Sequence, residues 1–348
     1  AADAVINFPE TDGNIPEFLD IDRLVGLARE YKIDSLHPGY GYLSENAELA
    51  ERCRDNGIVF IGPSPEVIRL MGDKVAAKGI AAQSGVPMLG ASQGAVHTLD
   101  EARKIAKRLG YPVIIKAVSG GGGRGMRIVH HQDELEQLYK IATAEAQVAF
   151  NDPSVFIEKY LENPKHIEFQ IVADNYGNVV HLGERECSIQ RKHQKLMEEA
   201  PSPALDERLR KKMAAAAVSL AKQAGYQSLG TVEFLLDHQK HFYFMEMNTR
   251  IQVEHPVTEE ITGIDLVELQ FNIGNFRPAA ILNYRCVNLR FTSTAGLSNA
   301  GSTQRTYKPD FLPVSVLSVN FVYHKAITSA LKPVLPPVQK LPLFSILW

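Results

Sequence analysis

The chain has 348 residues, of which 45% are hydrophobic and 22% charged, and its formal net charge is −3. These values are typical of a globular protein with two or three modest domains and a substantial core. The sequence has no apolar run near the roughly 20 residues that span a bilayer, and it has no basic stripe interleaved with aromatic residues. A membrane protein and a nucleic-acid-binding protein are therefore disfavoured.

The cysteines and the first residues bear on the compartment. Cys53, Cys187 and Cys286 are few and widely spaced, which favours a reducing compartment without a disulfide framework or a zinc site. The N-terminus shows neither an initiator Met nor a signal-peptide pattern, so we expect a cropped chain.

Residues 20–62 alternate between helix and strand patterns. A helix is predicted over 20–32 from apolar side chains at helical spacing, a second from a Ser44 cap to Gly57, and a short buried strand over 58–62. This order predicts the later part of a parallel α/β unit whose opening strands are absent.

The next hundred residues predict a small α+β module at roughly 88–160. It follows helices at 64–71 and 73–84. Within it, Thr98 and Glu101 have capping-box spacing before a helix that closes on Gly110. Strands at 112–117 and 125–129 flank a glycine-rich segment, and a helix follows at 132–147.

Residues 154–254 predict a second sheet. Three strand-like runs lie within 154–186, a long helix covers 206–224, and "GTVEFLLD" and "HFYFMEMN" form an antiparallel hairpin. The stretch 245–254, "MEMNTRIQVE", then alternates, with polar side chains at every even position from 246 onward. On an extended chain these side chains share one face, so they form either the wet side of an edge strand or a functional row.

Beyond residue 271 this order fails. Residues 271–348 contain eight Lys or Arg and one acid, Asp310, against 29 basic and 39 acidic residues in 1–270. The segment has no clear period and its prolines are spread through apolar runs. It is either an out-of-frame or read-through product or a genuine, unusual tail.

Phosphate-binding chemistry is suggested by "SGGGGRGMRIVHH". Consecutive glycines let backbone N–H groups approach an anion, although a plain flexible turn fits as well. Lys116 ends the apolar strand just before them and Lys74 begins a helix. Each is a candidate phosphate ligand; otherwise Lys116 is a snorkelling strand end and Lys74 a solvated helix start.

Carboxylates in the hairpin suggest a metal. Glu233 lies among apolar neighbours, and Glu246 and Asn248 share a face of the partner strand. Such oxygen ligands suit Mg²⁺ or Mn²⁺. The alternative is salt bridges to Arg250 or to the basic loop 184–203, which itself is either solvated or anion-binding. His166 and Glu168 alternate on one strand and are structural unless context shows otherwise.

Nine motifs in order resemble the ATP-grasp core of biotin carboxylase over about residues 1–270. They are "HPGYGYLSENA", "FIGPS", "MGDK", "IIKAVSGGGGRGMR", "EKYLENPKHIEFQ", "ERECSIQRKHQK", "EEAPSP", "GTVEF" and "MEMNTRIQVEHPVTE". The resemblance implies an α/β (α+β) ATP-grasp fold with the remnant of an N-terminal Rossmann-like domain. The implied division is 1–65 for that remnant, 66–270 for the ATP-grasp core, and 271–348 for the atypical tail.

The resemblance also implies roles for particular residues. The residues implied for ATP are Lys74, Lys116, Gly122, Gly123, Glu158, Lys159, Tyr160, Leu161, His166, Gln190, His193, Glu233 and Glu246. Glu233, Glu246 and Asn248 would bind two Mg²⁺ or Mn²⁺ ions. The bicarbonate and biotin site would comprise Lys195, Arg250, Gln252, Val253 and Glu254, with Glu254 as the base that deprotonates bicarbonate and Arg250 stabilising carboxyphosphate and the biotin anion.

The implied reaction is ATP- and bicarbonate-dependent carboxylation of biotin on a carrier, the first half-reaction of an acyl-CoA or pyruvate carboxylase, as in fatty acid biosynthesis. The implied partners are a biotin carboxyl carrier protein or domain, a carboxyltransferase subunit and, in the family, a second copy. We expect the cytoplasm, or a mitochondrial or plastid matrix. Nothing in 271–348 resembles the family's next domain, so the alternative is a truncated homologue that only binds ATP or associates with a full-length subunit.

Overall fold

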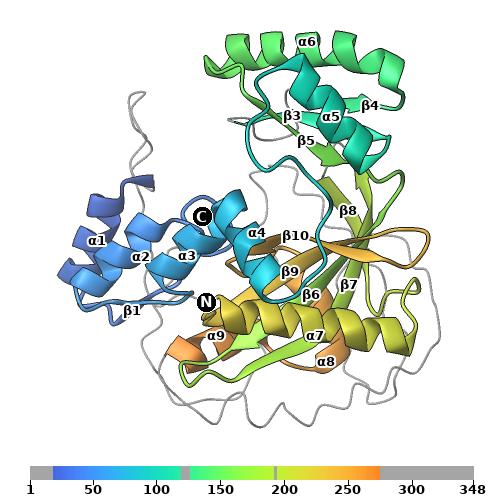
Figure 1. Cartoon of the computed structure of the whole chain (residues 1–348). Helices are drawn as coiled ribbons and strands as arrows, with labels where there is room; N and C mark the ends of the chain where they lie inside the picture. The colour runs from blue at the N-terminus through green and yellow to red at the C-terminus, as the bar shows by residue number, and fades with distance from the viewer. Residues whose placement is uncertain (1–18, 119–125, 192–193, 275–348) are drawn as a thin grey trace.

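The structure, a computed structural model, describes residues 19–118, 126–191 and 194–274. Three sheets organise them: a parallel pair, a three-stranded antiparallel sheet and a five-stranded antiparallel sheet. Figure 1 shows the three-stranded sheet with its two helices at one end, apart from the large sheet, with the β7–β8 hairpin reaching toward it. The predicted mixed class of helices and sheets is confirmed. No helix in these ranges is long and apolar enough to cross a membrane.

Residues 19–72 form a small α/β layer. Its helices are α1 (Ile21–Glu30), α2 (Ala47–Asp55) and α3 (Pro65–Gly72), and β1 (Ser35–Leu36) pairs in parallel with β2 (Val59–Phe60). The predicted parallel unit is thus present, but Ser44 does not cap α2. Asn46 does, because its side chain accepts a 2.8 Å hydrogen bond from the backbone N–H of Leu49.

The second module contains two helices on a three-stranded sheet. After α4 (Lys74–Gln83), the elements are α5 (Leu99–Leu109), β3 (Val113–Ala117), β4 (Met126–Val129), α6 (Gln132–Phe150) and β5 (Val155–Lys159), in strand order β4-β3-β5. The predicted capping box is confirmed: the Thr98 side chain accepts from the Glu101 N–H and Glu101 accepts from the Thr98 N–H. Apolar side chains of both helices and of β3 and β5 form one core.

The large sheet has the order β10-β9-β6-β7-β8, with every pair antiparallel. Its strands are β6 (Lys165–Ala173), β7 (Val179–Arg191), β8 (Gln194–Glu199), β9 (Ser228–Leu236) and β10 (Phe242–Asn248). The expected β9–β10 hairpin is present. The expectation of a basic loop over 184–203 is wrong in part, because residues up to Arg191 continue β7 and 194–199 form β8; residues 192–193 lie outside the described ranges.

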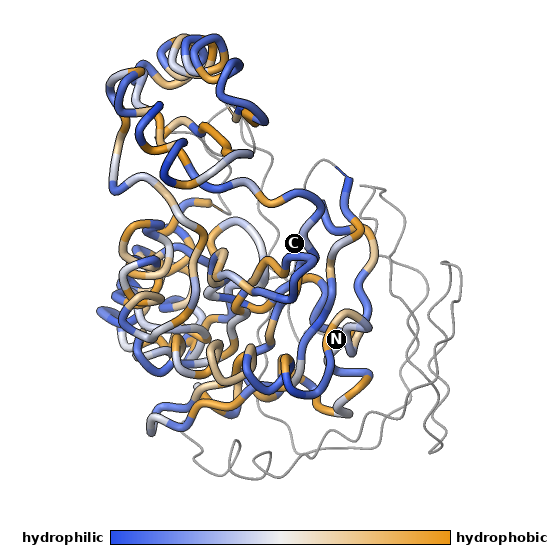
Figure 2. Tube along the Cα trace, turned by 45° about the vertical axis from the view of Figure 1, so that its right-hand side comes forward, coloured by the Kyte–Doolittle hydropathy of each residue, from blue (hydrophilic) through white to orange (hydrophobic). Residues whose placement is uncertain are grey.

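Helices cover both faces of this sheet. Long α7 (Glu207–Gln223) packs on the face lined by Ile167, Phe169 and Phe234. On the other face, one end is apolar and packs against α9 (Leu266–Gly274), which follows α8 (His255–Thr262). Figure 2 shows hydrophobic and hydrophilic residues alternating along the helices, as one-sided burial requires. The remaining part of that second face carries the charged side chains described next.

Candidate active site

Four charged side chains lie in register across four strands of the large sheet. Arg185 of β7 is paired with Glu168 of β6, Glu168 with Glu233 of β9, and Glu233 with Glu246 of β10. Directly opposed residues place their side chains on the same face of a sheet. Antiparallel pairing therefore brings together charges that lie up to 78 residues apart in the sequence, between 168 and 246.

Lys195 joins three carboxylates from different elements. Its Nζ lies 2.5 Å from Glu168 Oε2, 2.9 Å from Glu233 Oε1 and 2.7 Å from Glu254 Oε1. Burial alone would lower the pKa of Lys195, but Glu168, Glu233 and Glu254 outweigh it and raise that pKa. The ammonium is thus a permanent cation, and its side chain remains 21% exposed, so one side of it can meet an incoming anion.

Arg185 is the most deeply buried cation of the site, with an exposed fraction of 0%. Its Nε donates to Glu168 Oε1 at 2.6 Å and its Nη2 to Gln252 Oε1 at 2.7 Å. The Nη1 group donates to Gln170 and Thr258. A buried guanidinium needs such a full set of acceptors. In the sequence Arg185 stands within a basic segment and was not predicted as a site residue. The alternation of polar residues in "HIEFQ" and "ERE" is the local signal that could have indicated its contact with Glu168.

Glu233 has the compensation that its apolar surroundings require. Besides Lys195, its carboxylate bonds His166 Nε2 at 2.8 Å, Asn248 Nδ2 at 2.7 Å and Gln252 Nε2 at 3.0 Å. Burial alone would raise the pKa of Glu233, but the hydrogen bond from His166 and the charge of Lys195 lower it by more, so the pKa of Glu233 lies below its usual value. The alternative of pairing with Arg250 is not what the structure shows, whereas pairing with the basic segment is, through Lys195.

The predicted row along "MEMNTRIQVE" is not a single strand face. β10 ends at Asn248 and the chain then bends and turns before α8 begins at His255. Gln252 and Glu254 nevertheless return to the cluster from this bend, while Arg250 lies beside it, with Nε 3.2 Å from Glu45 and Nη2 3.3 Å from Asn248 Oδ1. Strand alternation ends at Asn248, so the loop that follows, and not a strand face, brings Gln252 and Glu254 to the cluster. Val253 is half-buried in the same loop.

The acidic end of the row fits a divalent cation. Burial and then the negative charge of Glu233 raise the pKa of Glu246, and Lys74 is near enough to oppose this shift. Within the described ranges no cation of the chain forms an ion pair with Glu246. Crowded carboxylates beside an amide oxygen are the hard ligands that Mg²⁺ and Mn²⁺ prefer. The metal role of Glu233, Glu246 and Asn248 stays a prediction. Glu246 and the Asn248 amide oxygen could take part in holding an ion, whereas both oxygens of Glu233 already bond other side chains, Lys195 and His166 among them.

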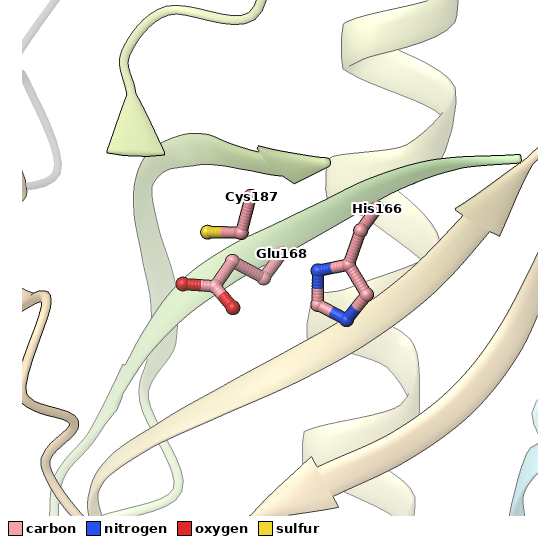
Figure 3. A group of neighbouring side chains, drawn as sticks. All are labelled: His166, Glu168 and Cys187. Carbon is pink, nitrogen blue, oxygen red and sulfur yellow. The ribbon is translucent and has the colours of Figure 1, made fainter. Parts of the chain in front are cut away.

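His166, Glu168 and Cys187 form a second group with potential metal ligands within 4.8 Å of one another (Figure 3). Both oxygens of Glu168 already bond cations, Arg185 and Lys195. Burial also raises the pKa of the Cys187 thiol well above its usual value, so the protonated thiol is a poor ligand. We assign this group to the charge network and not to a metal site.

Glu198 is a buried carboxyl of β8 with an unpartnered oxygen. The residue is 4% exposed, and its Oε2 has no hydrogen-bond partner. Burial, with the nearby Glu254 and Glu168, raises the pKa of Glu198 to about 7. Glu198 was not predicted as a site residue, because the local sequence "EEAPSP" contains no sign of its burial.

The remaining predicted nucleotide residues lie on the three-stranded sheet, in the connection after it, and on α4 and β7. Glu158 bonds Lys116 at 2.5 Å and also bonds Lys78, a residue that the sequence analysis missed. Lys159 turns its ammonium to the carbonyls of Gly110 and Tyr111, both at 2.9 Å. Tyr160 and Leu161 follow in the connection to β6, Lys74 is exposed at the start of α4, and Gln190 is exposed near the tip of β7. Gly122, Gly123 and His193 lie outside the described residues.

The fold and this site are those of an ATP-grasp protein, and comparison with known families agrees. Residues 73–280 match the family described as "Carbamoyl-phosphate synthase L chain, ATP binding domain", and residues 1–68 match "Biotin carboxylase, N-terminal domain". The chain belongs to the biotin carboxylase family.

Three relatives show the extent of the similarity. The biotin carboxylase of Nostoc sp. is 58% identical over 256 residues, 74% of this chain and 57% of that protein. The mitochondrial pyruvate carboxylase of Rattus norvegicus is 48% identical over 85% of this chain and 25% of that protein. The biotin carboxylase domain of Hydrogenobacter thermophilus 2-oxoglutarate carboxylase, solved with MgADP, ADP and bicarbonate, has a TM-score of 0.69 and 50% identity over 76% of this chain and 59% of that one. The chain thus spans less than two thirds of each relative.

Proposed function

We propose that this chain binds ATP with Mg²⁺ or Mn²⁺ and carboxylates biotin, borne by a carrier protein or domain, with bicarbonate as the carbon source. The main support is the bonding of Lys195 to Glu168, Glu233 and Glu254. Glu168 also bonds Arg185, and Glu233 also bonds His166 and Gln252. The result is a charged, partly open site beside the acidic residue Glu246. The relatives' similarity and the bicarbonate in the Hydrogenobacter domain support the same assignment.

The chain's own residues would divide the work as follows. Lys116 and Lys74 would hold phosphate oxygens, with Gly122, Gly123 and the connection at 158–161 completing the nucleotide site. Glu254, fixed by Lys195, would take the proton of bicarbonate as it attacks the γ-phosphoryl group. Arg250 would stabilise the resulting carboxyphosphate and then the biotin anion, because a fixed cation lowers the energy of developing negative charge. A bound divalent ion would neutralise charge on the phosphate oxygens.

Bicarbonate-dependent ATP hydrolysis, measured with and without free biotin, tests this function directly. We expect biotin to stimulate hydrolysis and Arg250→Ala to remove the stimulation. Arg103→Ala is the matched control, since Arg103 pairs with two exposed acids of the smaller module, Asp100 and Glu136. A folded chain that binds no nucleotide would refute the proposal. Nucleotide binding without bicarbonate-dependent turnover, with co-purification with an intact carboxylase, would support the binding-only alternative.

The proposed partners and location of the chain follow from the same function. A carrier with biotin, a carboxyltransferase subunit and a second copy of the chain are the proposed partners, because the relatives include both separate biotin carboxylases and pyruvate carboxylases. Relatives are also named chloroplastic and mitochondrial, so we retain the cytoplasm or an organelle matrix as the proposed location.

A further inference from the structure

The carboxylate of Glu158 is shared between two lysines from different parts of the molecule. Lys116 belongs to β3 of the three-stranded sheet, whereas Lys78 belongs to α4, which packs against α7 and β10 of the large sheet. Lys116 Nζ lies 2.5 Å from Glu158 Oε2, and Lys78 Nζ bonds the other oxygen, Oε1. One carboxylate therefore ties α4 to the smaller module.

The ring of Phe156 lies close to the ammonium groups of both lysines. The Nζ atoms of Lys78 and Lys116 lie 5.9 and 5.8 Å from the centroid of the Phe156 ring, which is within cation–π range. The two cations carry one more positive charge than Glu158 can balance. Among the described residues neither lysine forms a second ion pair, so the three side chains together carry a net charge of +1.

Exposure distinguishes the carboxylate from its partners. The Glu158 side chain is 11% exposed, while those of Lys78 and Lys116 are 38% and 31% exposed. Both lysines can therefore turn toward solvent or a ligand, but Glu158 cannot. If Lys116 leaves Glu158 for a phosphate oxygen, a nearly buried carboxylate must keep another cation or remain uncompensated, which is unfavourable.

We propose that Lys78 is a positioning residue for nucleotide binding: it remains on Glu158 as the counter-ion that allows Lys116 to move from that carboxylate to the nucleotide phosphates. The inference rests on the proposed ATP-binding function and adds a residue to it. Lys78 lowers the cost of releasing Lys116, so its effect appears in nucleotide affinity and not in the chemical step.

Calorimetric titration of the 348-residue chain with ATP and Mg²⁺, together with ATP kinetics, tests this role. Lys78→Met should weaken ATP binding about tenfold and raise KM for ATP with little change in kcat, as expected for one uncompensated carboxylate. Lys78→Arg should restore most of the affinity. Lys212→Met is the matched control, because Lys212 Nζ lies over a different ring, 5.4 Å from the Phe242 centroid.

A double-mutant cycle separates this role from a general effect of charge or folding. On a Glu158→Gln background, Lys116 is already released, so Lys78→Met should change ATP affinity less than twofold. An equal, tenfold loss on both backgrounds would overturn the proposal, since Lys78 would then act on the nucleotide without Glu158. If Lys78→Met bound ATP with wild-type affinity, the role proposed for Lys78 would also be overturned, but the proposed ATP-binding function would stand. A wild-type chain that binds no nucleotide would refute the proposed function along with the inference.

Discussion

The two charged groups of this protein differ in how they are held. On the large sheet, Arg185, Glu168 and Glu233 are almost fully buried and fixed by strand register. At the smaller module, Lys78 and Lys116 are about one-third exposed and meet Glu158 where two parts of the chain join. The first group is built as a rigid template, and the second can exchange partners. The difference matches the proposed roles: the group on the large sheet orients small reactants, and the group around Glu158 binds the nucleotide.

The largest effect should come from the rigid group. Arg185→Met leaves Glu168 buried with one partner fewer, so we expect a loss of about 3–5 kcal/mol in the free energy of unfolding. Urea denaturation measures it. Arg103→Met, in an exposed pair, should cost less than about 1 kcal/mol. Similar values for the two variants would show that burial does not control this cluster.

Lys195→Met should abolish bicarbonate-dependent turnover and destabilise the chain by about 2–4 kcal/mol at pH 7. The wild-type pKa values of Glu168 and Glu233 lie below the usual 4.5, so their stabilising contribution is present above pH 4.5 and is lost as the pH falls. Without Lys195 these carboxyls should take up protons more readily. The stability difference from wild type should therefore shrink between pH 7 and pH 4.5.

Denaturation across this pH range tests the Lys195 prediction, with Lys211→Met as the control because Lys211 pairs with Glu207 on the surface. A stability difference that stays constant with pH would show that Lys195 does not set the ionisation of Glu168 and Glu233.

Glu198→Gln should remove a loss of stability that the wild type shows as the pH rises. The folded-state pKa of Glu198 is raised to about 7, so its protonated form stabilises the fold below about pH 4.5 and this contribution is lost as the pH rises to about 7. Gln cannot ionise, and at pH 8 the variant should be more stable than wild type by about 2 kcal/mol. Melting curves at pH 5 and pH 8 measure the difference. A variant less stable than wild type at pH 8 would contradict the burial argument.

The smallest expected effect concerns the metal. Added Mg²⁺ should raise the unfolding midpoint of the wild type by mass action, equivalent to about 1–2 kcal/mol at tens of times the dissociation constant. Glu246→Gln should lose most of this rise, and EDTA should reverse it in the wild type. Glu66→Gln, which removes an exposed carboxylate paired with Arg54, should retain it. An equal rise in both variants would place the ion elsewhere.

The elements of the fold were largely predictable from local chemistry. Pro65 in the first turn of α3, the capping box at Thr98 and Glu101, and the alternation in the β9–β10 hairpin act within a few residues, so the sequence displays them directly. The errors also arose locally. Ser44 and Asn46 are both good caps, and charged side chains in 184–203 concealed a strand pair because its polar residues are compensated within the site.

The residue types available for chemistry are visible in the sequence, and resemblance to biotin carboxylase implies roles for Lys195, Arg250 and Glu254. Which charges meet depends on the tertiary structure. Register across four strands placed Arg185, Glu168, Glu233 and Glu246 in one row, and the join between α4 and the smaller sheet gave Glu158 its second lysine. The physical reason is that the energy of a charge depends on burial and on partners distant in sequence, and local patterns contain neither.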